Sequence, residues 1–361
     1  MTHPRALYPA LFALLLPACG GEGTGALPDA EVTTSVVSDS NRIAGGDPAA
    51  EAAATITADD VARRIGVIAH DSMRGRRTPS PELEATARWI AAELEAMGVR
   101  PGAGDSFLQH YGVQPPGSAV DAEEVVAPNV VGMLEGSDPE LRDQYIVFSA
   151  HMDHVGVGRP DASGDSIYNG ADDDASGTVA VLEIAEAFAG MDPAPRRSMI
   201  FLLVSGEERG LWGSQYFAAN PTVPVESMVA NLNLDMVGRN WTDTIVAIGK
   251  EHSDLGTTLH RVAERHPELR MEPIDDPWPA ESFYTRSDHY NFARRGVPVL
   301  FFFNGTHEDY HAPSDEPDLI DADKAARVAQ LVFYLGLEVA DAEAPPAWDP
   351  ESYRQVVETA R

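Results

Sequence analysis

The sequence predicts an α/β fold in which a mixed, mostly parallel sheet is sandwiched between helices. Apolar segments of strand length alternate with segments of helical periodicity along most of the 361 residues, and most of these strands are apolar at consecutive positions. Continuous apolar strands are typical of a sheet covered on both faces, and alternation with helices favours parallel connections. The length suits one large domain.

The expected elements follow in chain order. An amphipathic helix is predicted over residues 82–98, because Leu83, Ala87 and Ile90 recur at helical spacing between the start signal TPSP and a terminal glycine. Apolar runs place the other elements: strands over 130–134, 145–150, 199–204, 228–234, 244–248 and 297–303, and helices over 177–189, 253–266 and 323–339. The largest irregular stretch, residues 107–127, is too small to be an inserted domain.

The N-terminal segment has the features of an export signal. Arg5 precedes an apolar run over residues 6–16, which is too short to span a bilayer. The letters LPAC, ending at Cys19, resemble a bacterial lipobox, in which the cysteine becomes the lipidated first residue; an ordinary secretory signal is the alternative. We therefore expect an exported protein, anchored by a lipid on Cys19 at the outer membrane, periplasmic face or cell surface, or otherwise secreted.

The composition along the chain predicts four segments. After the signal peptide of residues 1–19, residues 20–54 are predicted to be a flexible tether, residues 55–345 a single domain and residues 346–361 a C-terminal tail. The only cysteine is Cys19, which excludes intrachain disulfides and cysteine-rich zinc sites. A formal net charge of -31 disfavours nucleic acid and anionic membrane surfaces as partners. The sequence does not reveal the oligomeric state.

Histidines and acidic residues follow almost every predicted strand of the sheet. In chain order they are His151, Asp153 and His154, then Asp172, Asp173 and Asp174, then Glu207 and Glu208, then Asp235, and finally His307 and His311, with Tyr310 between them. Functional groups in open α/β sheets gather at the carboxyl ends of strands. Each residue alone could be a helix cap, a turn residue or a surface histidine, but buried together these carboxylates would repel one another without a cation.

The types of donor atom predict zinc or a similar borderline metal in a hydrolytic site, because imidazole nitrogens are mixed with carboxylate oxygens and no cysteine is present. The candidates outnumber the ligands that one ion needs, which favours two ions sharing a carboxylate and a water. One residue of the adjacent pair Glu207 and Glu208 would then bind metal, while the other accepts the proton of the water.

A set of motifs in fixed order carries a family resemblance: AHMDH, GADDDASG, SGEERGLWGS, NLDMVGR, RSDHYNFARRGVPVLFFF and DYHAPSD. They resemble metallopeptidase family 28, the co-catalytic dizinc aminopeptidases, which also includes glutamate carboxypeptidases and glutaminyl cyclases. The resemblance runs from about residue 61 to residue 339, without an inserted protease-associated domain. It implies a zinc-peptidase fold of the phosphorylase/hydrolase type, two Zn²⁺ per chain and peptide substrates.

The resemblance also implies the roles of single residues. The metal ligands would be His151 and Asp235 at one zinc ion, Glu208 and His311 at the other, and Asp173 as the bridge between them. Glu207 would be the general base, and the Asp153 carboxylate would orient His151. A cis peptide is implied between Asp173 and Asp174. Tyr310 would help to stabilise the tetrahedral intermediate, or would be a packing aromatic.

The substrate pocket is less clearly marked in the sequence. The candidates are Met236, Arg239, Ser287, Asp288 and Phe303, with further aromatic residues nearby. This aromatic content favours an aminopeptidase for apolar N-terminal residues. A carboxypeptidase, a dipeptidase, a one-zinc glutaminyl cyclase and an inactive binding domain are the alternatives. Dizinc deacylases with an inserted dimerisation domain are discounted, because the step from Asp235 to His311 (311 minus 235 is 76) leaves no space for that insert.

Overall fold

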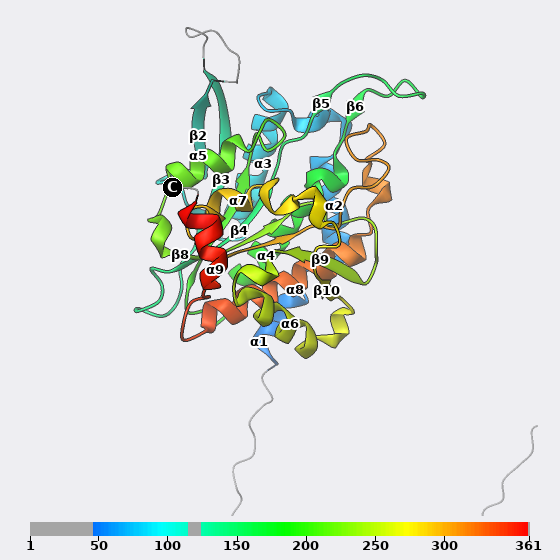
Figure 1. The fold of residues 1–361 in the computed structure, drawn as a ribbon. Helices are drawn as coiled ribbons and strands as arrows, with labels where there is room; N and C mark the ends of the chain where they lie inside the picture. The colour runs from blue at the N-terminus through cyan, green and yellow to red at the C-terminus, as the bar shows by residue number, and fades with distance from the viewer. Residues whose placement is uncertain (1–45, 115–123, 360–361) are drawn as a thin grey trace, which may run out of the picture. The chain divides into compact units, whose positions relative to one another are not determined.

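The computed structural model describes residues 46–114 and 124–359 (Figure 1). Cys19, the predicted signal peptide and most of the predicted tether lie outside these residues. The described part forms one compact unit that begins at Gly46. Within it, no helix has the length and apolar character that crossing a membrane requires.

A nine-stranded mixed sheet forms the centre of the fold, with the strand order β1-β3-β7-β4-β8-β11-β9-β10 and β2 paired to β3. The four central strands, β7, β4, β8 and β11, are parallel to one another. β3 pairs antiparallel with β1, β2 and β7, and β9 pairs antiparallel with β11 and parallel with β10. The strand bounds are β1 Arg100–Pro101, β2 Leu108–Val113, β3 Val125–Leu134, β4 Tyr145–His151, β7 Ser198–Val204, β8 Met228–Leu234, β9 Thr244–Ile248, β10 Glu272–Ile274 and β11 Val299–Phe302. A separate two-stranded ribbon joins β5 Gly156–Val157 to β6 Ile167–Tyr168.

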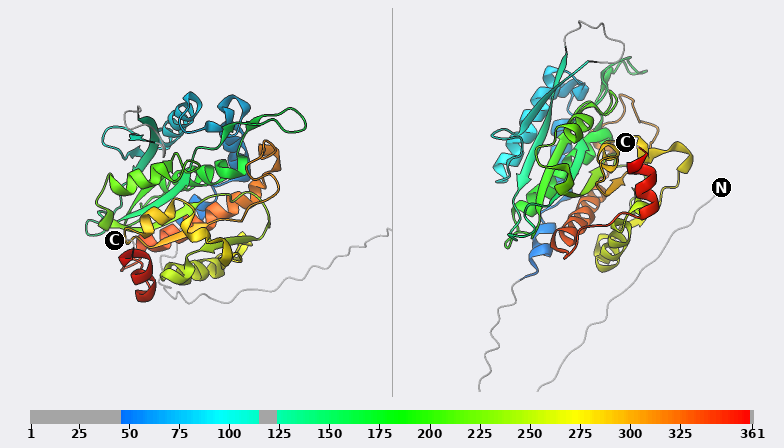
Figure 2. Two further views of the ribbon diagram at one scale, coloured as in Figure 1. Left: turned by 45° about the horizontal axis from the view of Figure 1, so that its top comes forward. Right: turned by 60° about the vertical axis from the view of Figure 1, so that its left-hand side comes forward.

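Helices cover both faces of the sheet, as the views in Figures 1 and 2 show. Their bounds are α1 Pro48–Ala53, α2 Ala58–Ile68, α3 Pro81–Ala96, α4 Gly177–Ala189, α5 Trp212–Ala219, α6 Leu255–Arg265, α7 His289–Ala293, α8 Ala322–Asp341 and α9 Pro350–Tyr353. The buried strand β4 shows the two layers. Ile146 and Phe148 join the core formed with α4 and α8, while Val147 joins the core that contains Phe217 of α5 and Phe292 of α7. The predicted two-sided burial of the sheet is thus confirmed.

One predicted segment was wrong. Residues 107–127, expected to be irregular, contain β2 and the start of β3, which pair antiparallel from Leu108 opposite Val130 to Val113 opposite Val125. Most side chains of β2 are at least partly exposed and only Tyr111 is buried, so the segment lacks the apolar run by which the other strands were found.

The folded unit also extends beyond the predicted domain limits of 55 and 345. In α1, which lies inside the predicted tether, Ala52 and Ala53 are buried, and the side-chain amide of Gln330 in α8 donates to the carbonyl of Ala53. Within the predicted tail, the indole of Trp348 donates to the carbonyl of Gly296, and Val357 is fully buried. Both segments are too short to show a clear apolar period, so composition alone suggested loose chain.

Candidate active site

The predicted site residues meet at one edge of the sheet. Their places are His151 at the end of β4, Asp173 in the turn before α4, Glu207 and Glu208 just after β7, Asp235 just after β8, and His311 in the loop that follows β11. The strands concerned are parallel neighbours, so their carboxyl ends converge there. After β7 the backbone turns at Gly206, where a φ of 75° suits a residue without a side chain.

A first group of donor atoms is formed by three buried side chains. The Nε2 atom of His151 lies 3.3 Å from Oδ1 of Asp173 and 3.6 Å from Oδ1 of Asp235. The Asp235 carboxylate is fixed from behind, because the hydroxyl of Ser287 donates to its Oδ2 at 3.0 Å. These three side chains present one nitrogen and two oxygens to a shared space.

Asp174 also lies near this group, together with His151 and Asp235. Its carboxylate, however, accepts hydrogen bonds from the backbone N–H groups of His151, Gly177 and Met236. Asp174 therefore ties the ends of β4 and β8 to the start of α4. We assign the third donor of the first group to Asp173, whose carboxylate faces the group directly. The peptide between Asp173 and Asp174 is cis, as expected.

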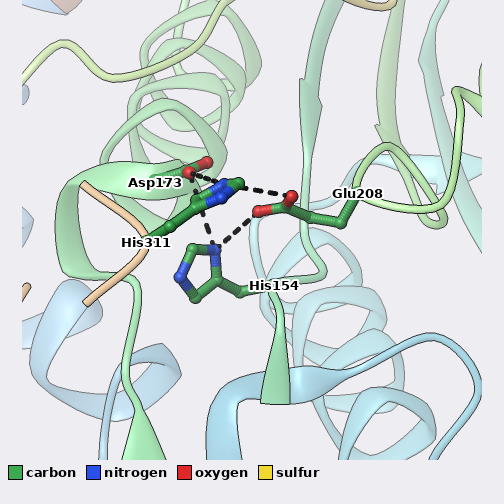
Figure 3. A group of neighbouring side chains, drawn as sticks. All are labelled: His154, Asp173, Glu208 and His311. Carbon is green, nitrogen blue, oxygen red and sulfur yellow. Dashed lines mark ion pairs between the residues drawn. The ribbon is translucent and has the colours of Figure 1, made fainter. Parts of the chain in front are cut away.

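The second donor group contains four side chains, shown in Figure 3. Nε2 of His311 lies 3.1 Å from Oδ2 of Asp173 and 3.1 Å from Oε2 of Glu208. Nδ1 of His154 lies 2.8 Å from Oε1 of Glu208 and 3.7 Å from Oδ2 of Asp173. Asp173 thus directs one oxygen to each group, which is the geometry of a bridging carboxylate.

His154 is the member of this group to which the sequence assigned no role. It directly follows Asp153, the residue that was predicted to orient His151. The backbone turn after β4 orients the His154 ring towards Glu208 and His311, and the sequence does not predict this turn.

Asp153 approaches His151 both with its carbonyl oxygen and with its carboxylate. Nδ1 of His151 lies 3.2 Å from the Asp153 carbonyl oxygen, whereas the nearer carboxylate oxygen is 3.7 Å away. Both carboxylate oxygens are already engaged. One accepts the backbone N–H of Glu207 at 3.2 Å, and the other accepts the hydroxyl of Thr78 at 2.8 Å. The Asp153 carboxylate therefore positions Glu207.

The Glu207 carboxylate lies beside the donor groups and faces the same cavity. Burial raises its pKa well above the ordinary value, the nearby His151 opposes this rise, and the carboxylates of Asp288 and Asp235 add to it. A raised pKa suits a carboxylate that accepts a proton and then returns it.

Arg76 holds the two ligand-bearing loops together, and sequence reasoning missed it. Its guanidinium is fully buried and donates to four carbonyls: Met152 at 2.9 Å, Asn169 at 2.5 Å, Gly170 at 2.9 Å and Ile68 at 3.1 Å. Burial lowers its pKa, while nearby carboxylates, Asp153 foremost, raise it. The residue connects the loop after β4 to the loop that carries Asp173.

Asp315 is a second positioning residue that the sequence did not single out. Its carboxylate accepts the backbone N–H groups of Asp172 and Asp173 at 3.0 to 3.1 Å. Asp315 lies four residues after His311, within the motif DYHAPSD, and this position could have marked it as a candidate. The sequence could not show that it binds the backbone of Asp172 and Asp173.

A cavity opens beside the donor groups. Its lining includes four residues of the site, His151, Asp173, Glu207 and Asp235, together with Met236, Phe283, Arg286, Ser287, Phe301, Phe303, Thr306 and Tyr310. The predicted pocket residues Met236, Ser287 and Phe303 therefore line it. Phe283 and Phe301 add apolar walls, and Tyr310 stacks on His311 with ring centroids 3.9 Å apart.

Two predicted pocket residues do not line the cavity. The Arg239 guanidinium binds the Asp309 carboxylate at 2.8 Å, and both side chains are largely buried. Asp288 is fully buried behind the cavity wall, where desolvation raises its pKa to about 7. The course of the backbone after each motif determines where the side chains of Arg239 and Asp288 point. The motif sequence does not reveal that course.

The donor set fits zinc. Among the described residues, Nδ1 of His154 and Oε1 of Glu208 are buried without a hydrogen-bond partner. Burial alone lowers the pKa of His311, but its contacts with Asp173 and Glu208 raise it to about 10. Imidazoles and carboxylates gathered in this way bind either protons or a cation, and nitrogen with oxygen donors suits Zn²⁺.

Nitrogen and oxygen donors gathered at the strand ends of an α/β sandwich are characteristic of the class of metal-dependent hydrolases. The sequence model of "Peptidase family M28" matches residues 129–336, more than half of the chain. The chain therefore belongs to peptidase family M28, which confirms the resemblance of its motifs.

Individual relatives agree with this assignment. A "Probable zinc metalloprotease" of Leptosphaeria maculans is 36% identical over 168 residues, which cover 44% of this chain and 35% of that protein. A "Probable leucine aminopeptidase" of Arthroderma otae is 25% identical, over 71% of this chain and 66% of that protein. The structure of the LapA aminopeptidase of Legionella pneumophila matches with a TM-score of 0.63 and 21% identity, over 88% of this chain and 81% of that one. The chain spans about a third of the length of three of the zinc metalloprotease relatives that it matches, and 64% of that of a fourth, from Pyricularia oryzae.

Proposed function

We propose that this chain is a zinc-dependent peptidase that holds two zinc ions and removes apolar residues from the N-terminus of peptides. The observation that carries the proposal is the Asp173 carboxylate, which directs Oδ1 towards His151 and Oδ2 towards His311. A carboxylate shared by two donor groups suits a pair of ions with a water between them. Membership of the family and the names of its relatives support the peptidase activity.

The residues around the cavity have separate tasks in this reaction. When bound, zinc polarises the scissile carbonyl and lowers the pKa of a bound water. The Glu207 carboxylate accepts the proton of the attacking water and passes it to the leaving amine. Asp153 holds the backbone N–H of Glu207, and so fixes where that carboxylate stands. The hydroxyl of Tyr310 reaches the same cavity and would donate to the oxygen that gains charge.

The walls of the cavity support a preference for apolar side chains. Met236, Phe283, Phe301 and Phe303 belong to one apolar cluster next to the donor groups. A side chain seated there would lose its contact with water, which contributes roughly 25 cal/mol for each Å² of apolar surface buried.

A carboxypeptidase is the second candidate, and one observation favours it. Arg286 lines the cavity, and a guanidinium can bind the terminal carboxylate of a peptide. This guanidinium also lies 4.7 Å from the centre of the Phe283 ring and 3.5 Å from the Glu281 carboxylate. Because Arg286 already has an acidic partner, we favour the aminopeptidase.

The test combines metal analysis with a substrate panel. The chain from Ala26 onward is purified, its zinc content is measured, and release is followed from free and N-acetylated dipeptides and from aminoacyl-anilides. The proposal expects about two zinc ions per chain and cleavage of unblocked substrates only. Cleavage of N-acetylated substrates would move the assignment to a carboxypeptidase or dipeptidase, and absence of bound metal would overturn the site.

We also propose that the protein is exported and carries a lipid on Cys19. The support is the N-terminal sequence alone. Labelling with a radioactive fatty acid in a bacterial host should mark the full chain and not the Cys19→Ser variant. Equal labelling of the two would refute the lipid anchor.

A further inference from the structure

His154 is a buried histidine whose ring nitrogens both lack a hydrogen-bond partner among the described residues. Buried polar groups in folded proteins are normally hydrogen-bonded, so this exception needs a cause. The ring nitrogens of the buried His289 also lack a partner in the described part of the chain, but only His154 lies in a group of possible metal donors. The residue lies next to a proposed metal ligand, Glu208, and Figure 3 shows its ring turned towards the space shared by Asp173, Glu208 and His311.

The contact between His154 and Glu208 is short without being a hydrogen bond. Nδ1 and Oε1 are 2.8 Å apart, yet neither atom has a geometrically satisfactory hydrogen-bond partner among the described residues. The two atoms belong to a group in which Asp173 and His311 also offer a donor atom, all within 4.8 Å of one another. A metal ion held within this group accepts lone pairs from both.

The distances within the group fit one ion. Neighbouring donors of a tetrahedral zinc ion with bonds of about 2.0 to 2.1 Å lie about 3.3 Å from one another. One donor atom from each of His154, Asp173, Glu208 and His311 lies within 4.8 Å of the others. The nitrogen–oxygen contacts among them are 2.8, 3.1, 3.1 and 3.7 Å long, and each imidazole contacts a different oxygen of Glu208. These separations place the four side chains close enough to share one ion.

The neighbouring backbone leaves room for the imidazole. Gly170 has a φ of 59°, and a Cβ atom at this position would lie 2.5 Å from the ring of His154. The same atom would lie 2.3 Å from the carbonyl of Asp173. A glycine is therefore required where the loop of the bridging carboxylate passes over His154.

We propose that His154 is a direct ligand of the second zinc ion, the one that Glu208 and His311 hold. This inference rests on the proposed dizinc function and goes beyond the five ligands that the motifs imply. The second ion then has four protein donors, while the first has three, from His151, Asp173 and Asp235. The second ion is consequently the last to be lost when zinc is removed.

X-ray absorption of the protein loaded with two zinc ions counts the imidazoles directly. Because wild-type protein is sufficient, the count does not depend on any variant folding. Three imidazoles per two zinc ions are expected, from His151, His154 and His311. Two imidazoles per two ions would overturn the role of His154 and leave the dizinc proposal standing, whereas wild-type protein that binds no zinc would overturn both.

Zinc retention in variants gives the second readout. His154→Ala and His154→Gln are dialysed against chelators of rising strength, beside the control His289→Ala, which removes another fully buried imidazole outside the two donor groups. Changes around a metal ligand commonly weaken metal binding 10–100-fold, so the affinity for the second ion should fall by at least about 10-fold in both His154 variants and not in the control. Wild-type retention of both ions by a folded His154→Ala protein would refute the proposal.

Discussion

Replacement of Arg76 by methionine tests whether the site depends on the buried guanidinium that connects its loops. The change removes four hydrogen bonds to the carbonyls of Ile68, Met152, Asn169 and Gly170. Each hydrogen bond from a charged donor contributes about 1.5–3 kcal/mol, which sets an upper limit of about 6–12 kcal/mol for the group. Loop relaxation and entry of water recover part of this energy. We expect the free energy of unfolding to fall by about 3–5 kcal/mol, as is typical when a buried charged partner is removed.

Arg197 provides the matched control. It is also a fully buried arginine that donates to carbonyls, those of Val339 and Ala342, but it lies at the opposite end of the parallel strands from the donor groups. Urea unfolding should show that both Arg76→Met and Arg197→Met are destabilised. Zinc competition should show weaker metal binding for Arg76→Met alone. An Arg76→Met protein within about 1 kcal/mol of wild type, with unchanged zinc affinity, would refute the reasoning.

Further variants test single parts of the site. Glu207→Gln keeps the shape but cannot accept a proton, so kcat should fall about 10²–10⁴-fold while zinc content stays at the wild-type level; a wild-type rate would contradict its role. Tyr310→Phe should lower kcat about 10²–10³-fold with little change in KM if the hydroxyl donates to the oxyanion, and an unchanged kcat would leave it a packing aromatic. Phe283→Ala widens the apolar wall, so kcat/KM for a leucyl-anilide should fall about 10–200-fold relative to a bulkier aromatic substrate, and equal losses for both would argue against a side-chain pocket there. Gly170→Ala should weaken zinc binding at least about 10-fold, whereas Gly98→Ala, also at positive φ but in open space, should not; equal zinc affinities would show that the loop adapts.

The sequence was sufficient for the sheet and the main donors because both leave strong local signals. Buried parallel strands such as β7 are continuous apolar runs, and the donor residues His151, Glu208 and Asp235 stand at or just after the ends of such runs. The weakly apolar β2 and the short helix α1 have no comparable pattern, so the sequence predicts irregular chain and tether at these positions. Their structure is set by contacts with distant parts of the chain, which periodicity cannot report.

The missed parts of the site have a common physical origin. Arg76 and Asp315 act on backbone groups far away in the chain, and no motif records which carbonyl or N–H a side chain will reach. The same limit explains Arg239, which points to Asp309 and away from the cavity. His154 was visible in the motif, but its direction depends on the turn after β4.

The ligands come from segments that lie far apart in the chain, between β4 and the loop after β11. A partly folded intermediate that lacks β11 and the loop after it would have no complete site, so zinc would bind with high affinity only after the whole sheet has assembled. Metal binding then draws the folding equilibrium towards the native state, by an amount set by the free zinc concentration. The same ions that serve hydrolysis would thus stabilise the fold at the last step of its assembly. In an unfolding experiment, we expect a chelator to lower the stability of the whole domain, which should then unfold in one cooperative transition.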